Sequence, residues 1–285
     1  MRARLPVTIA ILASSSVALG SLAFLPTSLA EEAMKHYYVD PDNGDDAAAG
    51  SSGSPLETIQ EALERAKPGN TIHLDSGEYR QDVRTVRDGT ALAPITITGP
   101  KDAVVTGGGR GRIVEVNHDN HVFQGFTING LHGNENRASG YRDKLLYAIG
   151  TEARDGVTGL KVMGMTLKNA GGECVRLRYF AQDNEIAGNT ISDCGVYDFR
   201  FGGGGKNGEG VYIGTAPEQW GENGAPTDDA DKSNDNHVHD NDIETNGNEC
   251  VDIKESSSGN LVEDNTCTGQ RDPNSAGLDS RGSGN

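Results

Sequence analysis

Apolar and polar residues alternate in short segments that resemble one another along the second half of the chain. Each segment places apolar residues on either side of a polar turn with Gly or Asn, and there are five copies: VFQGFTI (122–128), VMGMTL (162–167), IAGNTI (186–191), VHDNDI (238–243) and VEDNTC (262–267). Thr166 and Thr190 are 24 residues apart, and so are Asp242 and Thr266. The 52-residue separation of Thr190 and Asp242 is expected to hold two such periods and a small insertion.

A second kind of strand accompanies the first. Its copies are ECVRLR (173–178), EGVYIG (209–214), ECVDIK (249–254) and, more loosely, AGLDSR (276–281). Short strands that recur every 24 residues between Asn and Gly turns are typical of a parallel β-helix, in which each coil adds one strand to each sheet. Asn189, Asn241 and Asn265 fall at equivalent turns, and we expect a structural role because Asn tolerates left-handed backbone. The predicted fold class is therefore all-β.

The segment before the first repeats predicts a helix that caps the solenoid. Ser54 suits the N-cap, Pro55 suits the first helical position, and Glu57 completes a capping box. Pro68 and Gly69 would end the helix, whose apolar face is formed by Leu56, Ile59, Leu63 and Ala66. An amphipathic helix here can cover strand edges that the first coil would otherwise leave unpaired.

The two ends of the sequence carry further expectations. Residues 1–30 are typical of a secretory signal peptide, with Arg2 and Arg4 before an uncharged apolar run and a small-residue cleavage motif at 28–30. We expect one solenoid domain over residues 31–285, secreted, monomeric and without a membrane segment. A repeat begins at Asn260 and Asn285 lies 25 residues later, so the last coil is expected to be incomplete or covered by a partner.

The four cysteines have no zinc-site spacing, and an exported chain can form disulfides. Three pairings are possible for four cysteines. Cys174 and Cys194 are one coil apart and could bridge adjacent turns. Cys267 falls at the inward position that Ile191 and Ile243 occupy in other copies, which favours a core thiol.

Charge limits the class of ligand. The chain has 42 acidic and 25 basic residues, a formal net charge of −17. Nucleic acids and anionic membranes need a basic footprint, so neither is an expected partner. An acidic ligand would have to be held by a local positive patch or by a bound cation. Four of the acidic residues are expected in a solvated loop: Asp228, Asp229, Asp231 and Asp235.

Alternation in the second kind of strand separates inward from outward positions. The apolar positions, such as Val175 and Leu177, would point inward and the residues between them outward. The outer rows are Arg176, Tyr212, Asp252 and Asp279, and beside them Arg178, Gly214, Lys254 and Arg281. Three glutamates begin these strands, and their carboxylates are expected to swing out because unpaired burial is costly: Glu173, Glu209 and Glu249. Such a face is either a solvated charge ladder or a functional groove.

Part of this face resembles a known family. ECVDIKE (249–255), GNLVEDNT (259–266) and LDSRG (278–282) are similar to the active-site stretch of the chondroitinase B and alginate lyase group of polysaccharide lyases, which are right-handed parallel β-helices. YYVDP (37–41) and PITITGP (94–100) resemble the N-terminal region of these enzymes and of calcium-dependent pectate lyases. The resemblance implies that Glu249 binds a cation, Lys254 is the base and Arg281 is its partner. Gly247 stands where the group usually has a second acidic residue, which Glu209 or Asp252 would replace.

These residue types suit β-elimination on an acidic polysaccharide. A lyase removes the proton next to a uronate carboxylate and expels the glycosidic oxygen, which requires the carboxylate charge to be neutralised. Ca²⁺ takes several oxygen ligands, and Glu249, Glu209 and Asp252 are suitable donors. The positive charge of Arg281 would favour the neutral amine of Lys254 as the base. Substrate contacts are expected from Arg176, Arg178, Tyr212 and Asp279.

Two other functions fit the same rows. A β-helix without catalytic activity could bind carbohydrate or act as an adhesin, since fold alone does not decide function. A β-helix glycoside hydrolase or uronate epimerase would use carboxylates across adjacent coils, such as Asp252 and Asp279, and would not need Lys254. The products separate these hypotheses, because only a lyase leaves unsaturated uronate ends.

Overall fold

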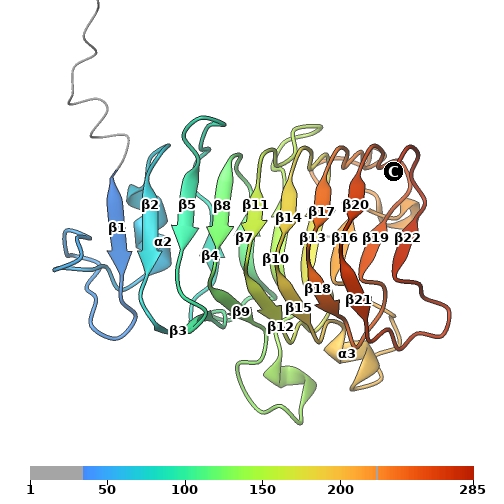
Figure 1. Cartoon of the computed structure of the whole chain (residues 1–285), viewed down its shortest axis with the longest axis horizontal. Helices are drawn as coiled ribbons and strands as arrows, with labels where there is room; N and C mark the ends of the chain where they lie inside the picture. The colour runs from blue at the N-terminus through green and yellow to red at the C-terminus, as the bar shows by residue number, and fades with distance from the viewer. Residues whose placement is uncertain (1–34, 223) are drawn as a thin grey trace, which may run out of the picture.

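The computed structural model describes residues 35–222 and 224–285, so the predicted signal peptide at 1–30 lies outside the described residues. The chain winds through three parallel sheets in turn, and from β2 onward each coil adds one strand to each of them (Figure 1). This arrangement is a right-handed parallel β-helix, so the predicted fold class is confirmed. No helix among the described residues is long and apolar enough to cross a bilayer.

The strands of each sheet follow one another along the solenoid. Sheet 1 consists of β1 (His36–Val39), β2 (Thr71–Leu74), β5 (Ile95–Thr98), β8 (His121–Gln124), β11 (Lys161–Met163), β14 (Glu185–Ala187), β17 (His237–His239) and β20 (Leu261–Glu263). Sheet 2 consists of β3 (Gly77–Tyr79), β6 (Ala103–Val105), β9 (Thr127–Asn129), β12 (Thr166–Lys168), β15 (Thr190–Ser192), β18 (Asp242–Glu244) and β21 (Thr266–Thr268). Sheet 3 consists of β4 (Val83–Arg84), β7 (Arg112–Val116), β10 (Lys144–Ile149), β13 (Val175–Arg178), β16 (Val211–Ile213), β19 (Val251–Ile253) and β22 (Leu278–Ser280).

The register of sheet 2 confirms the repeat but corrects its count. Thr166 pairs with Thr190, and Asp242 pairs with Thr266, as the 24-residue spacing predicts. Thr190, however, pairs directly with Asp242. The 52 residues between them therefore form one enlarged coil rather than two periods. Its extra length lies in two segments, one with α3 (Val196–Phe199) and one with the 3-10 helix η2 (Pro217–Gln219).

Asparagine ladders hold the turns of successive coils together. The Asn189 side-chain amide donates to Asn241 Oδ1 at 2.8 Å, and Asn241 donates to Asn265 Oδ1 at the same distance. A second ladder runs at another turn, through Asn184, Asn236, Asn260 and Asn285. Because these amides also donate to backbone carbonyls of the preceding coil, they satisfy turn groups that would otherwise be buried without partners. The predicted structural role of the first ladder is confirmed.

The N-terminal helix is present but starts later than predicted. α2 (Ile59–Arg65) is capped by Thr58, whose hydroxyl accepts from the Glu61 amide at 3.1 Å. Leu56 is not helical, because its amide donates to the Tyr38 carbonyl of β1 and its carbonyl accepts from the Asp40 amide. The helix lies in the first coil between β1 and β2, and it packs on β1, β2 and β4.

Both pairs of cysteines form disulfides. Cys174 is bonded to Cys194, as the spacing suggested. Cys250 is bonded to Cys267, so the prediction of a core thiol at Cys267 is wrong. Cys267 does occupy the inward position opposite Ile243, but Cys250 reaches the same point from the start of β19, with the two Cα atoms 5.9 Å apart.

The inward positions of sheet 3 form part of one continuous core. Val175, Leu177, Val211 and Ile213 are fully buried in it, which confirms the predicted parity. Leu278 departs from the pattern and is 46% exposed. It lies on β22, the strand at the end of sheet 3, where no further described strand packs over it.

Candidate active site

The outer face of sheet 3 carries three rows of polar side chains in register. The first row lies at the start of the strands and is formed by Lys144, the first residue of β10, and by three residues that each precede a strand by two positions: Glu173, Glu209 and Glu249. The middle row consists of Glu115, Tyr147, Arg176, Tyr212, Asp252 and Asp279. The third row lies at the strand ends and contains Arg178, Gly214, Lys254 and Arg281. The predicted rows therefore lie on one face, and they extend onto β10 and β7.

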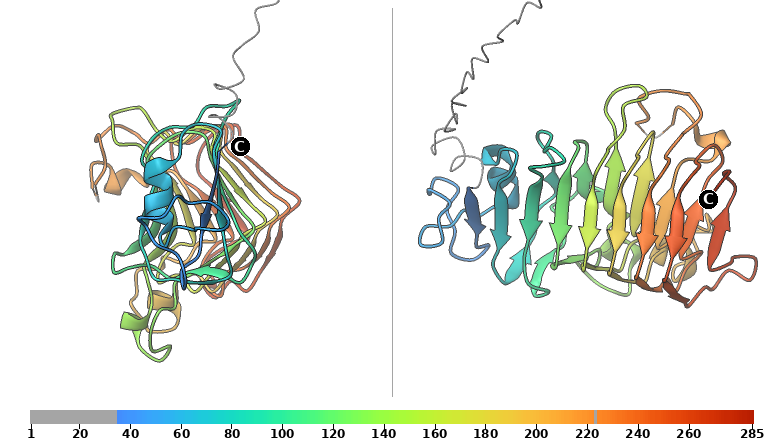
Figure 2. Two further views of the ribbon diagram at one scale, coloured as in Figure 1. Left: turned by 90° about the vertical axis from the view of Figure 1, so that its left-hand side faces the viewer. Right: turned by 45° about the horizontal axis from the view of Figure 1, so that its top comes forward.

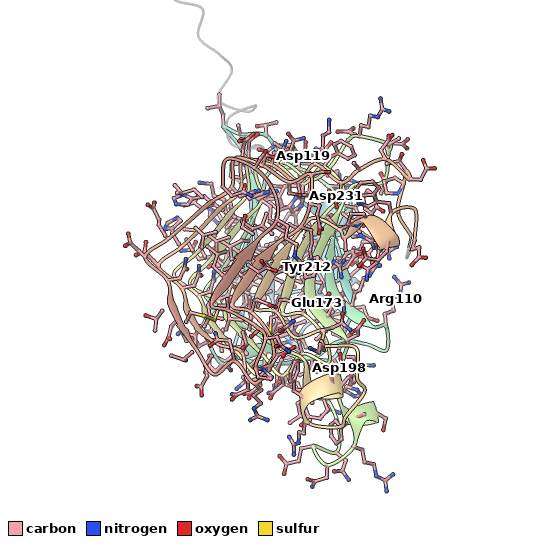
Figure 3. All side chains as sticks on the ribbon, turned by 90° about the vertical axis from the view of Figure 1, so that its right-hand side faces the viewer. Arg110, Asp119, Glu173, Asp198, Tyr212 and Asp231 are labelled. Carbon is pink, nitrogen blue, oxygen red and sulfur yellow. A yellow bond between two sulfur atoms is a disulfide. The ribbon has the colours of Figure 1, made fainter. Side chains whose placement is uncertain are left out.

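Two sets of loops form walls along this face. The first wall is formed by residues 214–222, which include η2, and by residues 224–233. The second is formed by 130–143 with the 3-10 helix η1 (Ala138–Gly140) and by 195–208 with α3, which are joined where the Tyr197 hydroxyl donates to the Tyr141 carbonyl at 2.7 Å. Both walls project from the same side of the coil section (Figure 2). Glu173 and Tyr212 lie between the segment of Asp231 and that of Asp198 (Figure 3).

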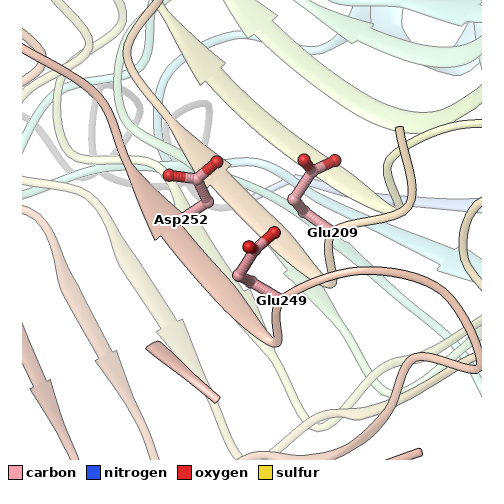
Figure 4. Close-up of side chains that lie close together, drawn as sticks. All are labelled: Glu209, Glu249 and Asp252. Atoms are coloured by element: carbon pink, nitrogen blue, oxygen red, sulfur yellow. The ribbon is translucent and has the colours of Figure 1, made fainter. Parts of the chain in front are cut away.

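Three carboxylates converge on the β16 and β19 part of the face. Asp252 lies in β19 at an outward position, whereas Glu209 and Glu249 precede their strands by two residues and share the parity of the inward positions. Their carboxylates nevertheless lie beside that of Asp252 (Figure 4). Each offers an oxygen within 4.8 Å of the others. All three residues are buried, and Glu249 Oε2 and Asp252 Oδ1 have no hydrogen-bond partner. We refer to Glu209, Glu249 and Asp252 as the carboxylate cluster.

Electrostatics oppose ionisation of the cluster in the absence of a counter-charge. Burial, reinforced by the charge of Glu173, raises the pKa of Glu209 well above its ordinary value. Burial also raises the pKa of Glu249 and of Asp252, against the effect of Lys254. Hard divalent cations take carboxylate oxygens as ligands. The orphan oxygens and the unbalanced negative charge fit such a cation, so these residues could hold one.

Lys254 and Arg281 lie on the face that the sequence predicts, with different partners. Lys254 forms an ion pair with Asp252, and its Nζ lies 4.8 Å from the centre of the Tyr212 ring. Arg281 lies beside it in the register but donates to Asp279 Oδ2 at 2.7 Å and faces Glu255 at 3.6 Å. The hydrogen bond from Arg281 to Asp279 raises the pKa of the guanidinium further.

The expectation that the outer rows face solvent is wrong for several residues. Glu173, Arg176, Arg178, Lys254 and the carboxylate cluster are all buried. For Arg178 the cause is the first wall: its guanidinium donates to the Gln219 and Glu222 carbonyls at 3.3 and 3.0 Å. Glu173 reaches the outer face but not solvent, because Lys144 and Arg176 both pair with it there.

Asp231 anchors the same wall and is not a solvated loop residue. It is fully buried, and its carboxylate accepts from the Tyr179 and Phe180 amides at 2.8 and 3.1 Å. The hydroxyls of Thr215 and Ser233 donate to it as well. Tyr179 and Phe180 have positive φ values of 50° and 62°, which this carboxylate helps to fix. No local sequence signal marked Asp231, because its partners lie as far as 52 residues away.

A cationic pocket lies next to the carboxylate cluster, over β10 and β13. Its volume is about 360 Å³, and it is lined by Arg112, Asp143, Lys144, Tyr147, Glu173, Arg176, Arg178, Asn207 and Gln219. Sequence reasoning missed its β10 contribution. β10 reads KLLYAI and is almost continuously apolar, so alternation gives no sign that Lys144 and Tyr147 face outward.

Comparison with solved structures gives the class of protein to which this architecture belongs. The alginate lyase from Paenibacillus sp. str. FPU-7 is similar with a TM-score of 0.62 and 25% identity, over 77% of this chain and 68% of that one. Pectate lyase Pel9A is similar with a TM-score of 0.61 and 14% identity, over 86% of this chain and 57% of that one. The predicted resemblance to parallel β-helix polysaccharide lyases is therefore confirmed.

Sequence comparison then gives the family. The model described as "Protein of unknown function (DUF1565)" matches residues 42–278, and the chain belongs to this family. Pectate lyase PEL9 of Emericella nidulans (strain FGSC A4) is 39% identical over 77 residues, which are 26% of this chain and 18% of that protein. The match thus spans less than a fifth of this curated relative, while the fold likeness extends over most of the chain.

Proposed function

We propose that this chain is a polysaccharide lyase that cleaves a uronate-containing polysaccharide by Ca²⁺-assisted β-elimination. One observation carries the proposal: the carboxylate cluster, with two buried oxygens that lack partners, lies beside the Lys254 amine between two walls of a parallel β-helix. The likeness to alginate and pectate lyases supports the reaction class.

The carboxylate cluster would hold the cation. Ca²⁺ bound there would supply a positive charge that neutralises a uronate carboxylate, which makes the adjacent C–H more acidic. Glu209 and Glu249 come from different coils, so the site depends on the register of β16 against β19. The side-chain oxygens account for part of a calcium coordination shell, and substrate and water would supply the rest.

Lys254 is the residue that we assign as base. Its Nζ is tied to Asp252 and packed on Tyr212, so its position relative to the cluster is fixed by two contacts. Arg281, held by Asp279, offers a planar guanidinium that can bind a carboxylate through two N–H groups. We assign Arg176, Arg178, Tyr212 and Asp279 to substrate binding, with Arg178 acting from beneath the first wall.

The proposal includes the setting in which the chain acts. The signal-like sequence at 1–30 supports export, and the two disulfides suit an oxidising compartment. We propose an extracellular monomer with one solenoid domain over 31–285, whose partner is an acidic polysaccharide. The net charge of −17 argues against nucleic acid or an anionic membrane as a partner.

The test is a depolymerisation assay on alginate, pectate and dermatan sulfate, with Ca²⁺ or with a chelator. Unsaturated uronate ends absorb ultraviolet light, and we expect them from at least one polymer in Ca²⁺ only. Lys254→Ala should lower kcat by about 10²- to 10⁴-fold, the usual contribution of a positioned base. Lys161→Ala is the matched control, because Lys161 also pairs with a carboxylate, Glu185, but on sheet 1.

Other products would overturn the proposal in specific ways. Saturated reducing ends would indicate hydrolysis, for which Asp252 and Asp279 lie opposite each other on adjacent strands. Tight binding without cleavage would indicate a carbohydrate-binding protein. Full activity of Lys254→Ala, with circular dichroism unchanged, would remove Lys254 from the mechanism.

A further inference from the structure

The residue after Glu249 breaks the alternation of sheet 3. Cys250 and Val251 are consecutive, yet both side chains lie in the core, while Glu249 lies on the outer face with the carboxylate cluster. The backbone shows the same break, because the amides of Cys250 and Val251 both donate to the Gly277 carbonyl, at 3.1 and 3.2 Å. Successive residues of a regular strand face opposite sides. A local irregularity of this kind can re-aim a side chain, as β-bulges do.

The two preceding coils have the same break. Cys174 and Val175 both donate their amides to the next coil, at 3.1 and 3.0 Å, and both side chains lie in the core. In the next coil Gly210 takes the place of the cysteine. A Cβ on Gly210 would approach the Ile243 side chain and the Cys250 carbonyl to 2.7 Å. In all three coils, therefore, the position after the glutamate is directed toward the core.

The three glutamates differ in what holds their carboxylates on the outer face. Glu173 is held by two ion pairs. Glu209 accepts hydrogen bonds from the Gly208 amide at 2.9 Å and from the Asn248 side chain at 3.3 Å. Glu249 forms no ion pair in the described part of the chain, and its Oε2 is buried without a hydrogen-bond partner. The position of the Glu249 carboxylate therefore depends on the backbone that carries it.

The Cys250–Cys267 disulfide fixes this backbone. Cys267 is an inward residue of β21 in the next coil, and the two Cα atoms are 5.9 Å apart. Because a disulfide joins only cysteines whose Cβ atoms approach each other, Cys250 stays directed toward the core while the bond is intact. Residue 249 then takes the opposite face to residue 250 by ordinary alternation.

We infer that the Cys250–Cys267 disulfide is a positioning element for Glu249, so that the cation affinity of the carboxylate cluster depends on this bond. Groups that orient a metal ligand typically account for about 10- to 100-fold in metal affinity. The Cys174–Cys194 bond has the equivalent place beside Glu173, which is outside the cluster and has its own ion pairs. This inference rests on the proposed function, in which the cluster holds the cation.

Calorimetric titration of Ca²⁺ into the full chain tests the inference without substrate or turnover. Cys250→Ala combined with Cys267→Ala should weaken Ca²⁺ binding about 10- to 100-fold. Cys174→Ala combined with Cys194→Ala is the matched control. The two bonds join cysteines 17 and 20 residues apart, so both double variants should lower Tm by similar amounts. The control should leave the Kd for Ca²⁺ unchanged.

A double-mutant cycle separates positioning of Glu249 from a general loosening of the fold. In the wild type, Glu249→Gln should weaken Ca²⁺ binding by a factor similar to that of the Cys250 and Cys267 double variant. In the chain without this bond, Glu249→Gln should cost no further affinity, because the carboxylate is no longer held in the cluster. Additive losses would overturn the inference, as would an equal loss of affinity in the Cys174 and Cys194 control.

Cys250→Ala combined with Cys267→Ile keeps the test valid if the double alanine variant does not fold. Isoleucine occupies the same inward position in the two preceding coils, at Ile191 and Ile243. This variant lacks the bond but retains an apolar side chain in the core, and we expect the same loss of Ca²⁺ affinity from it. Unchanged Ca²⁺ binding in this variant would overturn the inference.

The two proposals fail in different ways. If Ca²⁺ binding depends on the bond as expected but no polymer yields unsaturated ends, the positioning role stands and the lyase proposal fails. If Ca²⁺-dependent cleavage occurs and the Kd for Ca²⁺ is the same without the bond, the lyase proposal stands and the positioning role fails. A wild-type chain that binds no Ca²⁺ would also overturn the positioning role, and unsaturated ends formed in a chelator would then identify a lyase that needs no cation.

Discussion

Glu173 and Glu209 occupy the same position in adjacent coils and illustrate two ways to bury a carboxylate. Both precede a strand of sheet 3 by two residues, and both are almost inaccessible to solvent. Glu173 has Lys144 and Arg176 as ion-pair partners. Glu209 accepts from the Gly208 amide and from Asn248, and the carboxylates of Glu249 and Asp252 lie beside it.

The pKa values of the two residues move in opposite directions. At Glu173 burial opposes ionisation, but Lys144 and Arg176 outweigh it and lower the pKa well below its ordinary value. At Glu209 burial and the charge of Glu173 both raise the pKa. The first carboxylate is thus a structural counter-ion, whereas the second has no ion-pair partner among the described residues. Shape and burial alone would not distinguish them, and the difference lies in the neighbouring side chains.

The largest effect on stability is expected from removing the carboxylate of Glu173, which has two ion-pair partners. Glu173→Gln leaves Arg176 without its carboxylate partner and Lys144 with only Asp143. Breaking a buried ion pair in this way costs about 3–5 kcal/mol of unfolding free energy. Urea unfolding in a chelator measures it, and Glu209→Gln is the matched control, expected to be neutral or stabilising. Equal losses in the two variants would refute the distinction between the two positions.

The next largest effect is a pH dependence of stability that is expected from the buried imidazole of His121. Burial lowers the pKa of His121 from 6.5 to about 4, and its Nε2 has no hydrogen-bond partner. The unfolded chain therefore binds the proton first, so the contribution of His121 is complete above pH 6.5 and is lost as the pH falls toward 4. The loss is about 3 kcal/mol over that window. Unfolding free energies of wild type and His121→Leu between pH 7 and pH 4 would check it, and parallel pH profiles would contradict it.

Ca²⁺ binding at the carboxylate cluster, which includes Glu209, should stabilise the folded protein. Ca²⁺ at a hundredfold excess over its Kd would raise the unfolding free energy by about 2.7 kcal/mol. Glu209→Gln and Glu249→Gln should lose most of this gain, while Glu115→Gln, in the middle row of the same sheet, should keep it. Thermal unfolding with and without chelator is the measurement, and a gain that survives in both cluster variants would place the cation elsewhere.

The smallest effect on stability is expected from an ion pair that is exposed to solvent, in contrast to the buried pairs of Glu173. Lys161 and Glu185 pair at 2.7 Å on the outer face of sheet 1, with side chains 52% and 28% exposed. Solvent screens such a pair, so Lys161→Gln should change stability by less than about 1 kcal/mol. A loss comparable to that of Glu173→Gln would mean that burial is not what separates the two ion pairs.

Much of this architecture follows from local pattern. The 24-residue repeat and the period-two alternation placed Arg176, Tyr212, Asp252 and Asp279 in one row, and the same alternation put Lys254 beside Arg281. These inferences hold because a parallel sheet keeps its register from coil to coil, so sequence spacing translates directly into position in space. The three acidic residues that the family resemblance assigns to a cation also converge, although alternation alone gives Glu209 and Glu249 an inward parity.

The remaining features depend on contacts that spacing does not encode. The burial of Arg178 results from carbonyls 41 and 44 residues away. The partners of Glu173 include Lys144, which lies on a strand without alternation. The Cys250–Cys267 bond joins two positions that each look like ordinary core sites. Periodicity locates a side chain on a face, but it does not state which loop covers that face or which charge stands opposite.

The enlarged coil shows that the strand register does not depend on the length of the loops. Asn184 bonds to Asn236 across 52 residues with the same 2.9 Å amide contact that joins Asn236 to Asn260 across 24. The alignment of successive coils is therefore independent of the number of residues in the loops between them. Wall segments of other lengths could therefore be grafted at this coil to reshape the groove. The asparagine ladder would keep the underlying strands in register.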